Sequence, residues 1–250
     1  MLEKEQTFQD RNGPHPHVIV GDGITALAFL ETCLTRAVTD VIVIGQNASQ
    51  LGRGAAYAKG ETGTPWRYAY LLNSPADDID PDFAAWLEMR WSDVVEKMTG
   101  RAPNWLCAAE PLLARGDRYG INVPREFYGD FMEDRAREII SRLQSRGASV
   151  TLLDDTALSL DVSQTAITLT TQTGQIVHAA SVDIAPGGPA TLRIDGDDGP
   201  FSAPSVFDHE HRIAEHIKAG AEIFCIGGNA AMLDVLRLCQ SLVADQDVRF

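Results

Sequence analysis

The stretch HVIVGDGITALAFLETCLTRAVTDVIVIGQ, residues 17–46, decides the fold. A short apolar run, His17 to Val20, enters a glycine turn. Apolar residues then recur at helical spacing until a second apolar run, Val41 to Ile44. A strand, a tight turn, a helix and a second strand within about 30 residues form the unit in which a right-handed crossover joins two parallel strands. The sequence therefore predicts an α/β fold, a Rossmann-like domain with a parallel sheet.

The glycine turn fits the dinucleotide-binding pattern G-x-G-x-x-G/A. The first glycine permits the sharp turn, the second lets a pyrophosphate approach the backbone, and the small sixth residue lets the helix pack close to the sheet. The helix start offers N–H groups and partial positive charge to phosphates. The alternative is a purely structural turn. The predicted binding residues are Gly21, Asp22, Gly23, Ile24, Thr25 and Ala26.

The same pattern calls for an acidic residue at the end of the second strand, where it accepts hydrogen bonds from ribose hydroxyls. Here Gly45 and Gln46 follow the strand, and the nearest acid, Asp40, lies on its wrong side. We predict Gln46 as a neutral ribose partner. Without a charge-assisted bond, such a site loses on the order of 1 kcal/mol or more.

The rest of the sequence predicts further strands and helices of the same fold, with a helical insertion between them. Residues 45–82 lack periodicity, and a loop of that length in a compact domain is usually functional. Apolar stripes predict helices, and short β-rich runs with a turn at Thr173-Gly174 predict a parallel strand, an antiparallel meander and a return to the sheet. The predicted helices are 83–98, 125–146, 210–218 and 230–243. The predicted strands are 150–153, 157–162, 166–171, 176–178, 182–185, 222–226 and the beginning of one at 247–250.

Composition excludes several classes of function. The chain has 250 residues, 44% hydrophobic and 22% charged, as in an ordinary globular protein of one or two domains. Its formal charge of −14 argues against a general binder of nucleic acid or anionic membranes. The polar opening and the lack of any apolar stretch near 18 residues predict neither a signal peptide nor a membrane span. We therefore expect a cytoplasmic protein.

The cysteines and histidines predict no metal site. The cysteines are far apart in sequence, which favours reduced core residues over a disulfide or a ligand set. The histidines near residue 210 recur at i and i+2, which places them on different helix faces. The cysteines are Cys33, Cys107, Cys225 and Cys239.

Three further segments carry a family resemblance. They are LGRGAAY at 51–57, LLNSPA at 71–76 leading into DFAAWL at 82–87, and VPREFYGDF at 123–131. In this order, after the glycine turn, they resemble the bacterial FAD-NAD(P)-binding proteins of the two-dinucleotide flavoprotein type. That family includes predicted FAD-dependent hydroxylases such as urate hydroxylase-like proteins. The resemblance covers about residues 17–243.

The resemblance implies a site for FAD. The glycine turn would hold the FAD pyrophosphate, while Arg53 and Gly54 would lie along the phosphates and ribityl chain. Leu72 and Asn73 would approach the flavin, and backbone groups near Leu158 would contact adenine. The implied activity is that of a flavin-dependent oxidoreductase, monooxygenase-like, in which NADPH or NADH reduces the flavin.

Each implied role has a structural alternative. Arg53 could form a surface ion pair, Asn73 could serve as a turn former before Pro75, and Arg125 could simply start a helix. A turn former and a helix-start residue are ordinary uses of these residue types.

A second glycine turn stands where the family has its NAD(P)H-binding fingerprint. It comprises Gly227, Gly228 and Asn229, with asparagine at a position where the family has glycine. Asparagine tolerates a positive φ, but its side chain stands where a pyrophosphate should approach. Gly187 ends the Ala-Pro-Gly segment that corresponds to the family's Ala-Thr-Gly linker, and it is a further predicted cofactor-binding residue.

The predicted domain organisation has three parts. Residues 1–16 form a flexible tail, 17–206 an FAD-binding domain with a helical insertion at about 80–146, and 207–250 the incomplete start of a second nucleotide-binding unit. A strand, a helix and half a strand cannot close a parallel unit, so we expect a missing portion, a second chain or a homo-oligomer to complete it. Two hypotheses follow: an oxidoreductase acting on a small-molecule substrate, or a non-catalytic or partial nucleotide-binding module.

Overall fold

A computed structural model of the protein describes residues 15–59, 70–164, 166–187, 199–203, 206, 209–228 and 230–242. The chain divides into two compact units. The first comprises Met1–Ala55 and Met132–Gly188, and the second Ala56–Phe131 and Pro189–Phe250. The division falls within the long helix α6 (Arg125–Ser145).

The first unit is built on a parallel sheet of four strands in the order β3-β2-β1-β7. The strands are β1 (His17–Val20), β2 (Asp40–Gly45), β3 (Ser149–Asp154) and β7 (Ser181–Ile184). The two central strands, β1 and β2, are buried along nearly their whole length, as continuous apolar runs in parallel sheets are. The predicted α/β, Rossmann-like fold is confirmed.

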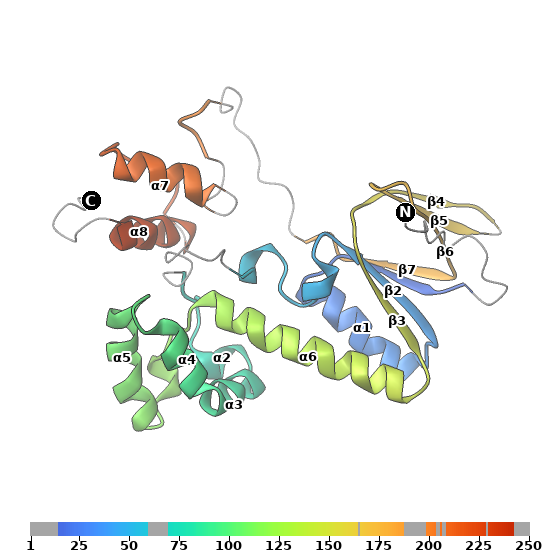
Figure 1. The fold of residues 1–250 in the computed structure, drawn as a ribbon, viewed down its shortest axis with the longest axis horizontal. Coiled ribbons are helices and arrows are strands. Elements are labelled where there is room, and N and C mark those ends of the chain that lie inside the picture. Colours follow the sequence, from blue (N-terminus) through green and yellow to red (C-terminus); the bar gives the residue numbers. More distant parts are fainter. Residues whose placement is uncertain are drawn as a thin grey trace, which may run out of the picture. The chain divides into compact units, whose positions relative to one another are not determined.

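Helix α1 (Ile24–Arg36) is the crossover that joins β1 to β2. Its buried stripe includes Leu27, Leu30 and Cys33, at the spacing that the sequence predicts. Helix α6 lies beside it, since Nη2 of Arg135 on α6 lies 3.3 Å from Oε2 of Glu31 on α1. Figure 1 shows α1 and α6 on one face of this sheet.

An antiparallel meander covers the opposite face of the sheet (Figure 1). Its strands are β4 (Ala157–Val162), β5 (Ile167–Thr171) and β6 (Ile176–Ala179), close to the predicted ranges. Apolar side chains of the sheet and the meander pack together in one core cluster, so the meander is part of the first unit's core. The buried members of that cluster are Val18, Ile42, Ile44, Leu169, Val177 and Ala179.

The amino ends of β1 and β7 are tied by polar side chains. Nδ1 of His17 lies 2.7 Å from Oγ of Ser181, and Nε2 of His17 lies 3.1 Å from Oδ2 of Asp183. His17 is 5% exposed, so these two partners provide polar contacts for a buried imidazole.

The described part of the second unit is helical. Its helices besides the start of α6 are α2 (Ala76–Ile79), α3 (Pro81–Met89), α4 (Trp91–Met98), α5 (Pro103–Ala114), α7 (Glu210–Lys218) and α8 (Ala230–Leu242). A single helix over 83–98 is wrong, because the backbone of Arg90 leaves the helical region and separates α3 from α4. Helix α5 was not predicted. Pro103 starts it, and a proline is tolerated in the first turn because no N–H partner is needed there.

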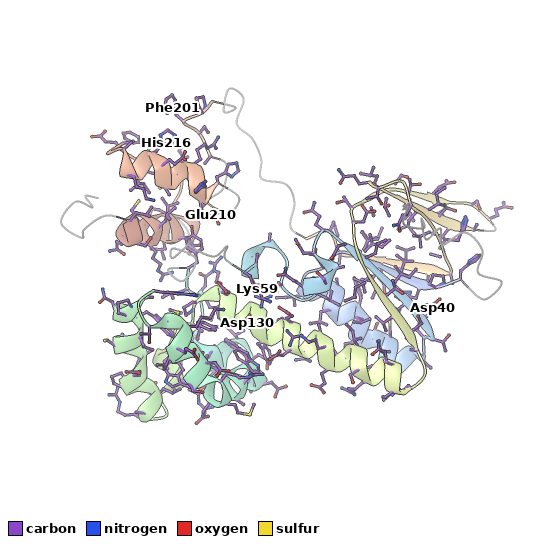
Figure 2. All side chains as sticks on the ribbon, viewed as in Figure 1. Asp40, Lys59, Asp130, Phe201, Glu210 and His216 are labelled. Atoms are coloured by element: carbon purple, nitrogen blue, oxygen red, sulfur yellow. The ribbon has the colours of Figure 1, made fainter. Side chains whose placement is uncertain are left out.

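Two clusters of buried side chains hold the second unit together. Aromatic rings of α3 and α6 pack at centroid separations of 5.0 to 6.1 Å. These rings belong to Phe83, Trp86, Tyr128 and Phe131. The helices α7 and α8 close a second cluster, which consists of Tyr70, Val206, Ile217 and Leu238. Figure 2 labels Phe201 and His216, a residue of α7, and the centroids of their rings lie 5.4 Å apart.

The strand predicted at 222–226 is wrong. Residues 221–228 are irregular, with Phe224 85% exposed and Ile226 93% exposed. A strand requires a neighbour to pair its backbone groups, and the structure pairs no described strand with this segment. The beginning of a strand predicted at 247–250 lies outside the described residues, as do residues 1–14 of the predicted tail.

The four cysteines are free thiols. Cys33 is buried and Cys239 half-buried, but Cys107 and Cys225 are exposed, so the prediction of core positions is wrong for these two. Cys107 lies on α5, and Cys225 lies in the irregular segment where a buried strand was predicted. Within the described ranges, the structure contains no helix that combines the length and apolar character needed to cross a membrane.

Candidate dinucleotide-binding site

The first glycine turn connects β1 to α1 at the carboxyl edge of the parallel sheet. Gly21 has φ +121°, and its N–H donates to the Ile44 carbonyl oxygen of β2 at 2.7 Å. A Cβ at Gly21 would collide with the carbonyl oxygen of Ala185, just after β7. Only glycine meets both the conformational and the spatial demand, so this turn packs β1, β2 and the end of β7 together.

A second glycine segment lies directly against this turn. The N–H of Gly52 donates to the Asp22 carbonyl oxygen at 2.8 Å. Gly54 has φ +56°, and a Cβ there would lie 3.2 Å from the Cα of Gly23, which caps α1. Two stretches of bare backbone therefore meet at the amino end of α1, where helical N–H groups lack intrahelical partners.

This arrangement fits a pyrophosphate. The first turn of α1 carries no acidic side chain, and its positive dipole end favours an anion. Ile24 is half-buried, Thr25 is exposed, and Ala26 is fully buried at the position where a small residue lets α1 approach the sheet. Their roles toward a cofactor remain predictions.

The end of β2 carries no acid of its own. Gly45 is buried and Gln46 is exposed. Asp40 is the first residue of β2, at the opposite end of the strand (Figure 2). A different carboxylate reaches this edge: Oδ2 of Asp22 accepts the N–H of Asn47 at 2.7 Å.

Arg53 lies in a buried ion pair. Its side chain is 2% exposed, and its Nε donates to Oε2 of Glu133 on α6 at 2.7 Å. Glu133 also accepts from Nη2 of Arg137 at 2.6 Å. Arg53 does form an ion pair, but the pair is buried, so the alternative of a surface ion pair is wrong. Burial also removes most of the solvent screening between the two charges. The phosphate-binding role of Arg53 remains a prediction.

The structure brings two of the quoted motifs together within the second unit. The N–H of Leu72 donates to the Val123 carbonyl oxygen at 2.8 Å, and Leu71 forms an antiparallel bridge with Pro124. Leu72 is buried. The LLN segment thus runs beside the segment that starts α6.

Arg125 fastens these two segments. Its Nε donates to the Leu71 carbonyl oxygen at 3.1 Å, and its Nη2 lies 3.4 Å from Oδ1 of Asn73. The same Nη2 lies 3.1 Å from Oδ2 of Asp234 on α8. Arg125 therefore does more than start a helix, because it holds the Asn73 amide oxygen. The predicted approach of Leu72 and Asn73 to a flavin is untested.

The remaining predicted residues lie at irregular positions of the backbone. Leu158 is 65% exposed, and the β4–β5 register shifts between Ala157 and Ser159, so Leu158 lies at a bulge. Gly187 has φ +84° and lies after β7. Their contacts with a cofactor stay predictions.

The second glycine turn lacks the context that a dinucleotide fingerprint needs. Gly227, with φ +113°, and Gly228 follow an irregular segment instead of a strand, and a Cβ at either would meet nothing within 4 Å. Helix α8 does follow them. Asn229 lies outside the described residues.

Three carboxylates that belong to no predicted site have defined environments: those of Glu133, Asp155 and Asp234. Burial raises the pKa of Asp234, and the charges of Arg125 and Arg237 oppose that rise. Spacing alone gives a weak signal for Glu133, which stands at i, i+4 from Arg137. No sequence pattern links Asp234 with Arg125, because 109 positions separate residues 125 and 234.

The parallel sheet, the glycine turn at its carboxyl edge and the second glycine segment define a dinucleotide-binding domain. The chain belongs to the FAD-NAD(P)-binding family, whose model matches residues 18–189. The cofactors of that family, FAD and NAD(P), are those that the sequence predicts. No curated protein matches the sequence.

Solved structures with related folds are distant in sequence. A thioredoxin reductase from Gloeobacter violaceus has 11% identity and a TM-score of 0.35, with 73% of this chain and 37% of that chain covered. A steroid monooxygenase bound to NADP has 14% identity and a TM-score of 0.40, with 75% of this chain and 28% of that chain covered. OTEMO in complex with FAD and NADP has 10% identity and a TM-score of 0.41, with 74% and 27% covered. The chain thus spans about a quarter to two fifths of the length of these proteins.

Proposed function

We propose that this chain is the FAD-binding part of a flavin-dependent oxidoreductase, monooxygenase-like, in which NADPH or NADH reduces the flavin. One observation carries the proposal: two glycine segments meet backbone to backbone at the amino end of α1, in a chain of the FAD-NAD(P)-binding family. The proposed location is the cytoplasm and the proposed partner a small-molecule substrate. Nucleic acid and membranes are not proposed, because the chain carries a formal charge of −14.

The residues of the first unit would hold the dinucleotide through their backbone. Gly21 shapes the turn, Gly23 and Gly54 leave room for a pyrophosphate, and the start of α1 supplies N–H groups. Bound FAD would supply the hydride and electron transfer. The chain's own contribution is to bind and orient the cofactor.

The side chain of Asn73, in the second unit, is a proposed flavin-orienting group. Arg125 fixes the Asn73 side chain through its amide oxygen, which leaves the amide N–H₂ as the donor side. A donor held in this way could bind a flavin ring edge or a ribityl hydroxyl. Its proposed role is orientation of the cofactor.

A second candidate function is a nucleotide-binding module that acts with a partner chain. The observation in its favour is the exposed segment 221–228, where a strand of the second nucleotide unit was predicted and is not formed. Exposed Phe224 and Ile226 would then pair with an added chain, or with a second copy, that completes the unit.

A visible absorbance spectrum of the purified protein separates these functions. Flavin absorbance that bleaches when NADPH or NADH is added without oxygen is expected for the oxidoreductase. Flavin absorbance without bleaching would instead favour the module. A colourless protein that takes up no added FAD would contradict the oxidoreductase.

A further inference from the structure

The carboxyl edge of the sheet holds an acidic group in an unexpected place. Strand β2 ends in Gly45, so its last position has no side chain. The carboxylate of Asp22, from the middle of the glycine turn, reaches this point and accepts the N–H of Asn47 at 2.7 Å. Asn47 lies two residues beyond the end of β2.

The side chain of Asp22 fills the space of a side chain at residue 45. A Cβ at Gly45 would lie 2.7 Å from the Cβ of Asp22, 3.1 Å from its Cγ and 3.0 Å from its Oδ2. These distances are too short for residue 45 to carry any side chain while residue 22 is aspartate. The φ of Gly45 is not positive, so space alone demands glycine there. The acid at position 22 therefore goes together with the glycine at position 45.

The Asp22 carboxylate has acceptor capacity left for a ligand. An ionised carboxylate offers about four lone-pair sites, and the Asn47 N–H uses one of them. Oδ1 has no partner among the residues that the structure describes, and the side chain is half-buried. Hydroxyl donors suit such an oxygen, whereas a phosphate would be repelled.

We propose that Asp22 is the acceptor for the ribose hydroxyls of the dinucleotide's adenosine, in place of an acid at the end of β2. The assignment rests on the proposed function, because it presumes that the glycine turn binds FAD. It replaces Gln46 as the ribose partner: Gln46 is exposed and uncharged, while Asp22 forms charge-assisted bonds.

The test measures the contribution of one ribose hydroxyl. The purified chain, freed of bound flavin, is titrated with FAD and with an FAD analogue built on 2′-deoxyadenosine, and flavin fluorescence or calorimetry reports affinity. Wild-type protein is expected to bind FAD about tenfold more tightly than the analogue, which corresponds to about 1.4 kcal/mol. In Asp22→Asn the ratio is expected to fall to about one or two, because the charge is lost while the shape is kept.

Asp154→Asn is the matched control. Oδ1 of Asp154 accepts the N–H of Ser49 at 2.8 Å, so this carboxylate anchors the same loop after β2. If loss of a loop anchor were the cause, Asp154→Asn would narrow the FAD-to-analogue ratio as much as Asp22→Asn does. Our expectation is that Asp154→Asn keeps the tenfold ratio.

A reciprocal exchange gives a second test. Gly45→Asp alone should destabilise the chain, because its Cβ overlaps Asp22. Asp22→Gly alone should lose the ribose preference, and Asp22→Gly combined with Gly45→Asp should regain it, since the acid then stands at the end of β2. Thermal unfolding of each variant verifies that the compared proteins are folded.

The outcomes separate this assignment from the proposed function. A wild-type chain that binds FAD and its 2′-deoxy analogue equally, or an Asp22→Asn variant that keeps the tenfold ratio, overturns the role of Asp22 and leaves FAD binding intact. A folded wild-type chain that binds neither ligand overturns the proposed function and, with it, this assignment.

Discussion

Arg125 and Asp234 form a buried ion pair, with Nη2 of Arg125 3.1 Å from Oδ2 of Asp234. The side chains are 14% and 2% exposed. The pair joins the start of α6 to α8, and Arg125 also binds the LLN segment through the Leu71 carbonyl oxygen. One guanidinium thus links three parts of the chain that are far apart in sequence.

Removing Arg125 should leave a buried carboxylate short of its nearest cation. We expect Arg125→Met to lower the free energy of unfolding by about 3 to 5 kcal/mol at neutral pH. Asp234→Asn should cost less, because the cation that it leaves, Arg125, is less completely buried than Asp234 and still donates to the Leu71 carbonyl oxygen. Urea denaturation measures both. Equal losses in the two variants would contradict the stranded-charge explanation.

The Arg125→Met deficit should also depend on pH. Burial already raises the pKa of Asp234, and loss of the opposing charge of Arg125 raises it further. A folded-state pKa above the unfolded one means that the folded protein binds the proton more tightly, so acid favours the folded state. The deficit should therefore shrink as pH falls through the raised pKa. A deficit that grows toward acid pH would contradict this sign.

Asp155 should show the opposite pH dependence. Its burial by itself would raise the pKa, but hydrogen bonds from Thr171, Thr173 and the Thr156 N–H hold the pKa below its usual value. A lowered pKa contributes stability above the unfolded-state pKa, and that stability is lost as pH falls through the folded-state pKa. We expect Asp155→Asn to be less stable than wild type at about pH 7, and the difference to shrink as pH falls below the unfolded-state pKa of about 3.9. Denaturant midpoints measured from about pH 7 down through this range test the prediction, and a constant difference would refute it.

The glycine turn should tolerate alanine less well than a helix end does. Gly21→Ala combines a positive φ with a collision against Ala185, so we expect loss of folding or of several kcal/mol of stability, of the order seen for strained and overpacked sites. Gly147→Ala is the matched control, since φ there is +84° and a Cβ would meet nothing within 4 Å. It should cost only about 1 to 2 kcal/mol. Thermal melts that give equal losses would show that the Ala185 contact is unimportant.

The cysteines should differ in reactivity. Burial raises the pKa of the Cys33 thiol, which keeps it protonated and shielded from solvent, whereas Cys107 and Cys225 are exposed. Iodoacetamide at neutral pH should modify Cys107 and Cys225 well before Cys33, as read by mass spectrometry of peptides. Early labelling of Cys33 in folded protein would contradict the burial of α1 against the sheet.

Local patterns predicted what depends on local structure. The glycine turn and the flanking runs of β1 and β2 lie within 30 residues, so residues 17–46 were enough to predict the parallel unit. The long α6 and the meander likewise follow from periodicity and turn residues. The break at Arg90 between α3 and α4 could not be predicted, because the apolar stripe continues across it.

Contacts between distant residues were not predictable. An apolar run at 222–226 looks like a strand, but a strand depends on a partner, and the sequence does not say whether one is present. The overlap of Asp22 with the space above Gly45 arises only when β1 and β2 align in parallel, with Val20 opposite Ile44. For the same reason the sequence predicted no carboxylate at the end of β2, whereas the structure places the carboxylate of Asp22 there.

Uptake of FAD by the purified chain tests the central claim most directly. Titration of the flavin-free protein should show one FAD bound per chain, with binding much weaker for FMN, which lacks the adenosine and its phosphate, and abolished when Gly23→Val fills the space facing Gly54. Equal binding of FAD by folded wild-type protein and a folded Gly23→Val variant would contradict the claim that the glycine turn is the dinucleotide site.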